Sequence, residues 1–216
     1  MKVIPAINCK TFANVTKRIK EAQAFLPKGD WLQIDISDGK FNPNRTWNDP
    51  ETLAAWLKAN KIKDINVEVH LMVVDPKPLA MRWLEAGAKR VIVHVEAITE
   101  KDVLFLKGFG KGKVGIALAP ATPIKKAEKF VAHFPFVQLL AVKPGFSGQK
   151  FERKVLEKIV FLKALHPDVT IEIDGGVNET TAPTIKDAGA DIVVSGSYIF
   201  DAKDKKEAYN VLKKIS

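Results

Sequence analysis

Polar side chains that could do chemistry stand at the ends of short apolar stretches. In Ile171–Asp174 apolar and acidic residues alternate, so one face of a strand would be apolar and the other would carry Glu172 and Asp174. Gly175 and Gly176 follow at once. A carboxylate at a strand tip can contact a ligand, and glycines let backbone N–H groups approach an anion without a Cβ in the way. We therefore expect Asp174 to be catalytic and the two glycines to contact the substrate.

The same alternation gives three earlier stretches one polar face each. Burying an ionisable group away from water is costly unless the group is paired or used. Several such faces in one protein therefore indicate a ligand site, although some members can also pair with one another. The four polar pairs are Gln33 and Asp35, Glu68 and His70, His94 and Glu96, and Glu172 and Asp174.

The last polar residue of each stretch is the best candidate for chemistry. Two carboxylates that face each other across a small substrate, Asp35 and Asp174, suit removal of a proton from one face of a carbon and delivery to the other. Such a carbon normally lies next to a carbonyl, and the enolate oxygen then needs stabilisation. A divalent metal held by His70 and the two aspartates could provide it. The alternative for His70 is a histidine satisfied within the protein interior.

Eight strand-and-helix units can be read along the chain. Each strand-like stretch is followed by apolar residues at helical spacing, such as Val15 and Ile19, with Asn14 as the expected N-cap of that first helix. The second helix is expected to start at Asp49-Pro50, with a cap followed by a first-turn proline. The expected strands are Val3–Asn8, Trp31–Ile36, Val67–Met72, Val91–Glu96, Val114–Leu118, Phe136–Val142, Ile171–Asp174 and Asp191–Ser195.

This repetition predicts an α/β fold, a single (β/α)8 TIM barrel in which residues 1–216 form one domain. An open, doubly wound sheet is the alternative, but its strands would need to be apolar on both faces. In a barrel the polar faces can point into the interior. We therefore expect all four polar pairs at the C-terminal mouth of the barrel.

Glycine-rich segments follow the last three expected strands. The loops after strands seven and eight of this fold commonly bind phosphate, helped by the N-terminus of a short helix, which we expect around Ser197–Phe200. Together the segments predict a phosphate site rather than plain turns. They are Gly145–Gly148, Gly175–Val177 and Gly196-Ser197.

Composition narrows the classes of partner. Lys and Arg outnumber Asp and Glu by 34 to 25, a net charge of +9 that favours anionic partners. The lysines are spread over many segments, so we expect a small phosphorylated sugar rather than nucleic acid. No apolar run has the length of a membrane span, no signal-peptide core is present and the single Cys9 permits no internal disulfide. We therefore expect a cytoplasmic protein without a membrane partner.

Several motifs follow one another in a specific order along nearly the whole chain. They are Pro5–Ile7, Asp35–Phe41, Val69–Val73, Pro144–Phe151, Glu172–Val177 and Ser195–Ser197. In this order they resemble the ribulose-phosphate 3-epimerase family. The resemblance implies a barrel of the ribulose-phosphate-binding type. It also implies an isomerase that interconverts D-ribulose 5-phosphate and D-xylulose 5-phosphate through an enediolate, using two aspartates and a divalent metal.

The resemblance also implies a role for each site residue. Asp35 and Asp174 would be both the acid/base pair and metal ligands, with His70 as a third ligand. Phosphate contacts would come from the loops after strands seven and eight. The expected substrate contacts are His70, Met72, Lys143, Gly145, Gly148, Gly175, Gly176, Val177, Gly196 and Ser197.

The departures from the family cluster at the expected chemistry. The family's remaining histidine ligand is Gln33 here, a neutral and weaker ligand, so we expect reduced affinity for the metal, whether Zn, Fe or Mn. Lys143 stands where the family usually has Asn or an acid, and this cation could stabilise the enediolate or contact the substrate. The family's substrate-contacting serine is Ala6, and two of its methionines are Ser37 and Leu140, with Met72 retained.

Other functions fit some of the same residues. One is a metal-free epimerase, and another is aldolase-type chemistry in which Lys143 forms a Schiff base with a ketose phosphate. A barrel that only binds a sugar phosphate, without catalysis, is the non-enzymatic alternative. No sequence feature fixes an oligomeric state, so a homo-oligomer stays open.

Overall fold

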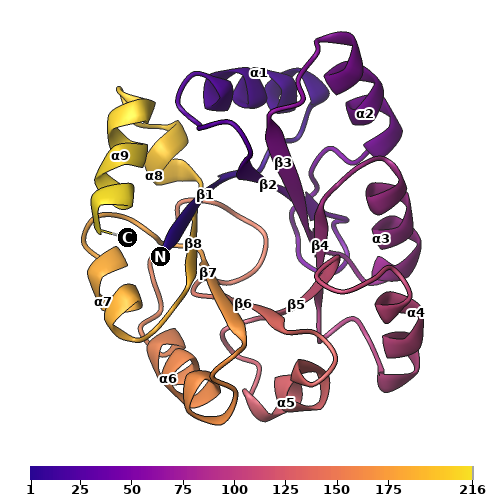
Figure 1. The fold of residues 1–216 in the computed structure, drawn as a ribbon, viewed down its shortest axis with the longest axis vertical. Helices are drawn as coiled ribbons and strands as arrows, with labels where there is room; N and C mark the ends of the chain where they lie inside the picture. The colour runs from indigo at the N-terminus through magenta and orange to yellow at the C-terminus, as the bar shows by residue number, and fades with distance from the viewer. Residues whose placement is uncertain (216) are drawn as a thin grey trace.

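The computed structural model describes residues 1–215, in which strands and helices alternate from end to end (Figure 1). The strands are β1 (Lys2–Ile7), β2 (Asp30–Ser37), β3 (Ile65–Met72), β4 (Arg90–His94), β5 (Val114–Leu118), β6 (Phe136–Leu140), β7 (Thr170–Asp174) and β8 (Ile192–Ser195). The helices are α1 (Phe12–Gln23), α2 (Pro50–Ala59), α3 (Pro76–Glu85), the 3-10 helix η1 (Glu100–Asp102), α4 (Val103–Lys107), α5 (Lys125–Val131), α6 (Val155–Leu165), α7 (Ala182–Asp187), α8 (Ser197–Phe200) and α9 (Lys205–Ile215).

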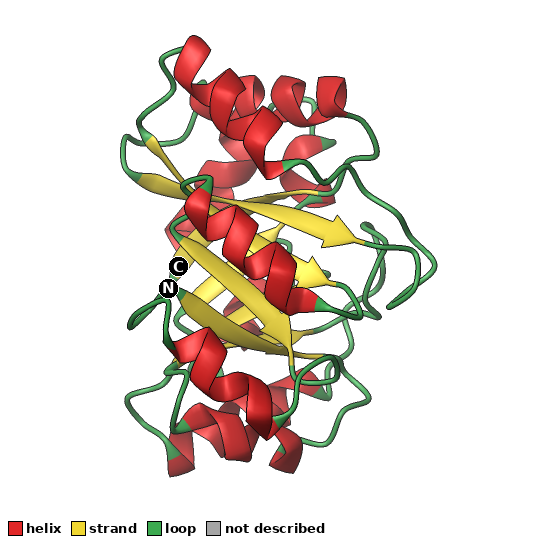
Figure 2. Cartoon of the chain, turned by 90° about the vertical axis from the view of Figure 1, so that its right-hand side faces the viewer, coloured by secondary structure: helices red, strands yellow, loops and turns green. Residues whose placement is uncertain are grey.

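The eight strands close into a barrel. Each strand pairs in parallel with the next, and β8 pairs in parallel with β1, where Lys2 lies opposite Ile192. The helices form an outer ring, and the side view shows the strands running through the middle of the molecule between them (Figure 2). The (β/α)8 prediction is confirmed, and the doubly wound alternative is wrong because an open sheet would leave β1 and β8 unpaired.

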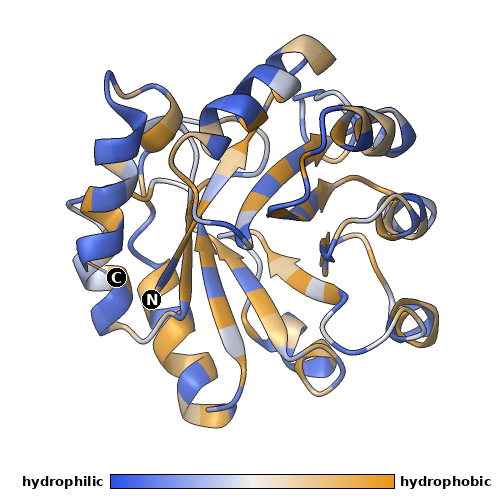
Figure 3. Cartoon of the chain, turned by 45° about the horizontal axis from the view of Figure 1, so that its top comes forward, coloured by the Kyte–Doolittle hydropathy of each residue, from blue (hydrophilic) through white to orange (hydrophobic). Residues whose placement is uncertain are grey.

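Two apolar layers hold the barrel, one on each side of its wall. The larger lies between the strands and the helices and takes the side chains of one face of every strand, such as Ile34 and Val69. The alternation along the strands is visible as blue and orange bands (Figure 3). A smaller cluster fills part of the interior and consists of Ile4, Ala6, Ile92, Ala117, Phe136, Leu140, Ile192 and Val194. Most of the remaining interior positions are polar, and those nearest the C-terminal end of the barrel build the site.

The helix starts follow local hydrogen-bonding chemistry. Asp49 caps α2 as predicted, because its Oδ1 accepts the backbone N–H of Thr52 at 3.0 Å ahead of Pro50. The expected cap of α1 was wrong by three residues. Thr11 is the N-cap, and its hydroxyl accepts the N–H of Asn14 at 3.3 Å. Asn14 therefore supplies the donor and not the capping oxygen. Across residues 1–215, no helix is both long and apolar enough to cross a bilayer.

Candidate active site

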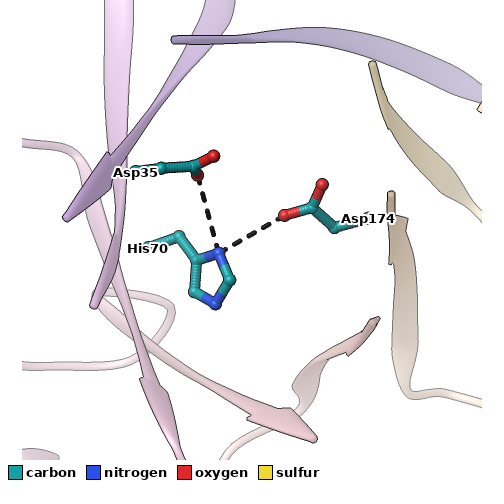
Figure 4. Close-up of side chains that lie close together, drawn as sticks. All are labelled: Asp35, His70 and Asp174. Carbon is teal, nitrogen blue, oxygen red and sulfur yellow. Dashed lines mark ion pairs between the residues drawn. The ribbon is translucent and has the colours of Figure 1, made fainter. Parts of the chain in front are cut away.

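Asp35, His70 and Asp174 meet at the C-terminal mouth of the barrel, as predicted. They lie near the ends of β2, β3 and β7, and one ligand atom from each falls within 4.8 Å of the others. Nδ1 of His70 points between the carboxylates, 3.6 Å from Oδ1 of Asp35 and 3.3 Å from Oδ2 of Asp174 (Figure 4). This nitrogen is buried and makes no hydrogen bond of good geometry.

The protonation of this group follows from burial and from its two negative charges. Burial acts to lower the pKa of His70, but the carboxylates of Asp174 and Asp35 outweigh it and raise the pKa to about 9. Burial, together with the charge of Asp35, raises the pKa of Asp174 against the opposing effect of His70. Without a metal, the imidazole therefore carries a proton between two acids.

Gln33 makes hydrogen bonds to both aspartates. Its Nε2 donates to Oδ1 of Asp35 at 2.8 Å and to Oδ2 of Asp174 at 2.9 Å. Its Oε1 accepts from Nε2 of Gln138 at 2.7 Å, and the same Nε2 donates to Oε1 of Glu172 at 2.8 Å. Gln33 thus presents amide hydrogens to the carboxylates, and an NH2 group is not a metal ligand. The sequence analysis did not single out Gln138, which lies on the inner face of β6 one register step from the mouth.

Glu68 and Glu172 do not lie at the mouth, contrary to the prediction. They are fully buried one layer deeper, on either side of Arg90 at the start of β4. Nε of Arg90 donates to Oε2 of Glu68 at 3.0 Å, and Nη2 donates to the same oxygen. Nη2 also lies 3.8 Å from Oε2 of Glu172. Burial and the neighbouring Glu68 raise the pKa of Glu172 well above its ordinary value. These two acids pair within the interior, which was the alternative considered for some members of the set.

His94 and Glu96 also lie behind the mouth and not on the cavity wall. Nε2 of His94 is 2.9 Å from Nε2 of His70, and Nδ1 of His94 is 2.9 Å from Oε2 of Glu96. Burial lowers the pKa of His94 to about 4, against the opposing effect of Glu96. His94 is therefore neutral at pH 7 and connects His70 to an acid outside the cavity.

A cavity of about 50 Å³ opens at the mouth of the barrel. It contains nearly the whole predicted set, which is Asp35, His70, Met72, Lys143, Gly145, Gly148, Asp174, Gly175, Gly176, Gly196 and Ser197. Val177 is not on its wall, because the side chain of Val177 is buried and its carbonyl accepts the hydroxyl of Ser195 at 2.9 Å. Only the backbone of Val177 is left to serve a ligand.

The glycine-rich loops have conformations that require glycine. Gly175 and Gly176 have φ values of +101° and +66°. A Cβ on Gly176 would lie 2.8 Å from the backbone nitrogen of Phe151, so the β7 loop packs directly on the chain that follows β6. Gly196 precedes α8, the short helix expected at Ser197–Phe200. The three loops predicted to bind phosphate therefore border one cavity.

Two asparagines were missed by the sequence analysis. Nδ2 of Asn8 donates to the carbonyl of Gly145 at 3.0 Å, and Nδ2 of Asn44 donates to the same oxygen at 2.7 Å. They fix the loop after β6 to the loops after β1 and β2. The position of Asn8 at the end of the first expected strand was the one available signal.

Lys143 and the residues that replace the family's methionines have distinct surroundings. Lys143 lines the cavity, but its side chain is exposed, and no ion pair of its Nζ is found within residues 1–215. Ser37 is buried, and its hydroxyl accepts from Nδ2 of Asn42 at 3.2 Å and lies 4.0 Å from the sulfur of Met72. Leu140 contributes to both the interior cluster and the cavity wall.

Comparison with known proteins gives one family. Residues 2–200 match the model of the ribulose-phosphate 3 epimerase family. The chain is 35% identical over 222 residues to the ribulose-phosphate 3-epimerase of Bacillus subtilis, covering 99% of this chain and 98% of that protein. It is 31% identical over 213 residues to the enzyme of the same name from Schizosaccharomyces pombe, covering 98% and 92%.

Solved structures share the fold at lower identity. A 3-hexulose-6-phosphate synthase superposes with a TM-score of 0.71 at 21% identity, over 100% of this chain and 99% of that one. Orotidine 5'-phosphate decarboxylase from Pyrococcus horikoshii superposes with a TM-score of 0.67 at 16% identity, over 99% and 98%. At these identities the likeness shows the barrel alone.

Proposed function

The chain belongs to the ribulose-phosphate 3-epimerase family, and from this premise we propose that it is an isomerase that interconverts D-ribulose 5-phosphate and D-xylulose 5-phosphate. The observation that carries the proposal is the meeting of Asp35 and Asp174 at one cavity that glycine-rich loops border. In this proposal residues 1–216 act as one catalytic domain.

The two aspartates exchange protons with carbon 3 of the sugar. One carboxylate removes the proton from C3, which leaves an enediolate, and the other carboxyl group returns a proton to the opposite face. The raised pKa of Asp174 suits a carboxyl group that holds a proton for delivery. After one turnover the first aspartate holds the proton from C3 and the second has lost its own, which is the starting state for the reverse direction. Before another turnover in the same direction, a proton must pass from the first aspartate to the second, directly or by exchange with solvent.

The negative charge of the enediolate needs nearby donors. His70 and the NH2 group of Gln33 place hydrogens between the carboxylates, within the interior and away from bulk water. A bound divalent cation would supply positive charge beside the oxygen that becomes negative. Lys143, at the outer wall, adds a cation that can reach the substrate from the solvent side.

Three residues fit a divalent metal, and a fourth does not. Nδ1 of His70 is buried, has no hydrogen bond and lies beside two carboxylate oxygens, which is the donor set of a Zn, Fe or Mn site. Gln33 turns its nitrogen toward the same point, so it supports the carboxylates without ligating. We propose a site of Asp35, His70 and Asp174 with lower affinity than one with two histidines.

The phosphate group of the substrate is assigned to the loops after β7 and β8. In this proposal the phosphate accepts hydrogen bonds from the backbone N–H groups of Gly176, Val177 and Ser197, and the cavity is lined by Gly176 and by Ser197 at the start of α8. The cavity is open to solvent on the side of the loop after β6, so the substrate can enter from there. The exposed residues Phe146 and Gly148 border this opening.

Exchange of hydrogen at C3 tests the proposed reaction. In D2O the enzyme should incorporate deuterium at C3 of ribulose 5-phosphate, whereas a protein that only binds the sugar gives no exchange. Asp35→Asn and Asp174→Asn should each lower kcat about 10²- to 10⁴-fold. Asp168→Asn is the control, because Asp168 is exposed at the opposite end of the barrel before β7. Full exchange in both active-site variants would contradict the proposed roles.

Direct metal binding tests the three-ligand site. Metal analysis of protein purified without added metal should find sub-stoichiometric divalent ion, and Gln33→His should tighten Zn(II) or Mn(II) binding by on the order of tenfold, since it adds an imidazole. Competition with a chelator measures the dissociation constant for each protein. An unchanged affinity in Gln33→His would show that position 33 is outside the metal's reach. Lys143 is exposed, and a Schiff-base amine needs desolvation, so we do not propose that chemistry.

A further inference from the structure

Nε2 of His70, which faces away from the two aspartates, is the first atom of a series of side-chain contacts that runs through His94 to Glu96. This nitrogen lies 2.9 Å from Nε2 of His94, and Nδ1 of His94 lies 2.9 Å from Oε2 of Glu96. The His94 side chain is fully buried. Neither His94 nor Glu96 borders the cavity, so neither can touch a substrate there.

Glu96 is itself fixed by donors. Its Oε1 accepts the backbone N–H of Ala119 at 3.0 Å and the hydroxyl of Thr122. A carboxylate held by donors on one oxygen is an acceptor on the other. Nδ1 of His94 must therefore carry the hydrogen that it shares with Glu96.

The hydrogen on Nδ1 of His94 determines which nitrogen of His70 carries a hydrogen. A neutral imidazole with its hydrogen on Nδ1 has a lone pair on Nε2, so His94 accepts from His70. His70 must then carry a hydrogen on Nε2. Its Nδ1 is thereby the atom left to face Asp35 and Asp174, either with a proton or with a metal ion.

Packing holds both rings in the required planes. The rings of His70 and His94 stack with centroids 5.1 Å apart and an interplanar angle of 22°. The ring of Phe41 lies 4.6 Å from that of His94. A rotation of either imidazole would break a hydrogen bond between two buried side chains, which is costly.

We propose that Glu96 and His94 are positioning residues that hold His70 with its hydrogen on Nε2 and its Nδ1 directed at the two aspartates. The proposal rests on the proposed function only in taking His70 to be a ligand of the reaction centre. Partners of this kind behind a ligating histidine typically change metal affinity about 10- to 100-fold when they are removed.

Nitrogen NMR tests the hydrogen positions without metal or turnover. The chain has four histidines, and the two not discussed, His133 and His166, can be assigned by substitution. In the metal-free protein we expect His94 with a hydrogen on Nδ1 alone and His70 with a hydrogen on Nε2. Glu96→Ala should move the hydrogen of His94 to Nε2, whereas Glu100→Ala, at an exposed ion pair with Lys129, should leave it in place. A hydrogen on Nε2 of His94 in the unsubstituted protein would overturn the proposal.

Metal affinity separates positioning from simple packing. His94→Leu removes the acceptor for His70, and it should weaken Zn(II) binding about 10- to 100-fold in chelator competition. His94→Gln keeps an oxygen that can accept the same hydrogen, so it should recover most of the loss. If His94→Leu lowers only the unfolding midpoint and leaves the Zn(II) dissociation constant unchanged, the role is structural and the proposal fails. If the unsubstituted protein binds no Zn(II), the metal part of the proposed function fails, and the NMR result alone decides the positioning role.

Discussion

At the scale of single residues, the barrel interior contains two layers in which one basic side chain lies between two carboxylates. In the upper layer one imidazole, His70, stands between two aspartates, and in the lower layer one guanidinium, Arg90, stands between two glutamates. Each layer has one cation for two acids, so each has room for one further positive charge. The lower layer is sealed, and the raised pKa of Glu172 indicates that a proton supplies this charge. The upper layer opens to the cavity, where a metal can supply it.

Glu96 makes a pH-dependent contribution to stability. Burial opposes its charge, but His94 and the hydroxyl of Thr122 outweigh this and lower its pKa from 4.5 to about 2. Because the folded pKa lies below the unfolded one, the contribution is complete above about pH 4.5 and is lost as the pH falls through 2. Glu96→Gln should therefore be less stable than the unsubstituted protein by about 2 to 3 kcal/mol at pH 7, allowing for partial screening.

Urea denaturation across pH measures this contribution. The stability gap between the two proteins should close as the pH falls from about 4.5 to 2, since a protonated Glu96 resembles glutamine. Glu100→Gln, at a mostly exposed side chain, should show a small gap at every pH. A gap for Glu96→Gln that is the same at pH 7 and pH 3 would assign the loss to packing and not to charge.

At the scale of elements, the loops after the strands carry the site because the strands fix where they begin. The β6 loop is attached to two other loops through the carbonyl of Gly145, and the β7 loop packs on Phe151 through Gly176. Contacts between loops, and not within them, therefore set the shape of the cavity wall.

Gly176 is the position where this packing is tightest. Gly176→Ala would place a Cβ in the left-handed region, at φ +66°, and 2.8 Å from the backbone of Phe151, which must shift. We expect a loss of stability of about 1 to 3 kcal/mol and a raised KM for ribulose 5-phosphate, because the proposed phosphate contacts move. Gly29→Ala is the matched control, with φ +80° and no atom within 4 Å of the added Cβ, at the end of the barrel away from the site. Equal KM values for the two variants would contradict the assignment.

The alternation of apolar and polar residues correctly predicted which side chains of each strand face the barrel interior. It did not predict how far along the barrel axis each side chain lies. The face that Glu68 and Glu172 share with His70 and Asp174 was correct, because side chains two positions apart on a strand point the same way. Depth along the barrel axis depends on the register between strands. That register places Glu68 opposite Arg90 and Glu172 opposite Gln138. A single arginine at the start of a strand is typically exposed to solvent, so the sequence did not indicate that Arg90 is buried between the two glutamates.

At the scale of the whole molecule, Arg90 connects several strands through the barrel interior. It pairs with Glu68 on the neighbouring β3 and with Glu172 across the barrel on β7. Its Cζ also lies 3.5 Å from the ring centroid of Phe136 on β6 and 4.5 Å from that of Trp31 on β2. One side chain thus contacts residues of four other strands.

Replacing Arg90 tests how much the barrel depends on this centre. Glu68 and Glu172 share one proton in this layer, so Arg90→Met would leave one buried carboxylate without its cation. This should cost about 3 to 5 kcal/mol of stability in urea denaturation. Adding Glu68→Gln and Glu172→Gln to that variant removes the uncompensated charge, so most of the loss should be recovered. A cost below about 1 kcal/mol for Arg90→Met alone would show that the glutamates are neutral in the folded protein.

The hydrogen bonds inside the barrel also constrain the order in which the chain can fold. Gln33 bonds to Gln138 and Asp174, which lie 105 and 141 residues further along, and Arg90 pairs with Glu172. A half-barrel ending after β4 would therefore contain buried donors whose acceptors have not yet arrived, and closing such long loops is slow. The interior is satisfied only when β2 to β4 and β6 to β7 are all present in register. Partly formed barrels are thereby kept less stable than the complete one, and unfolding should occur as one cooperative transition.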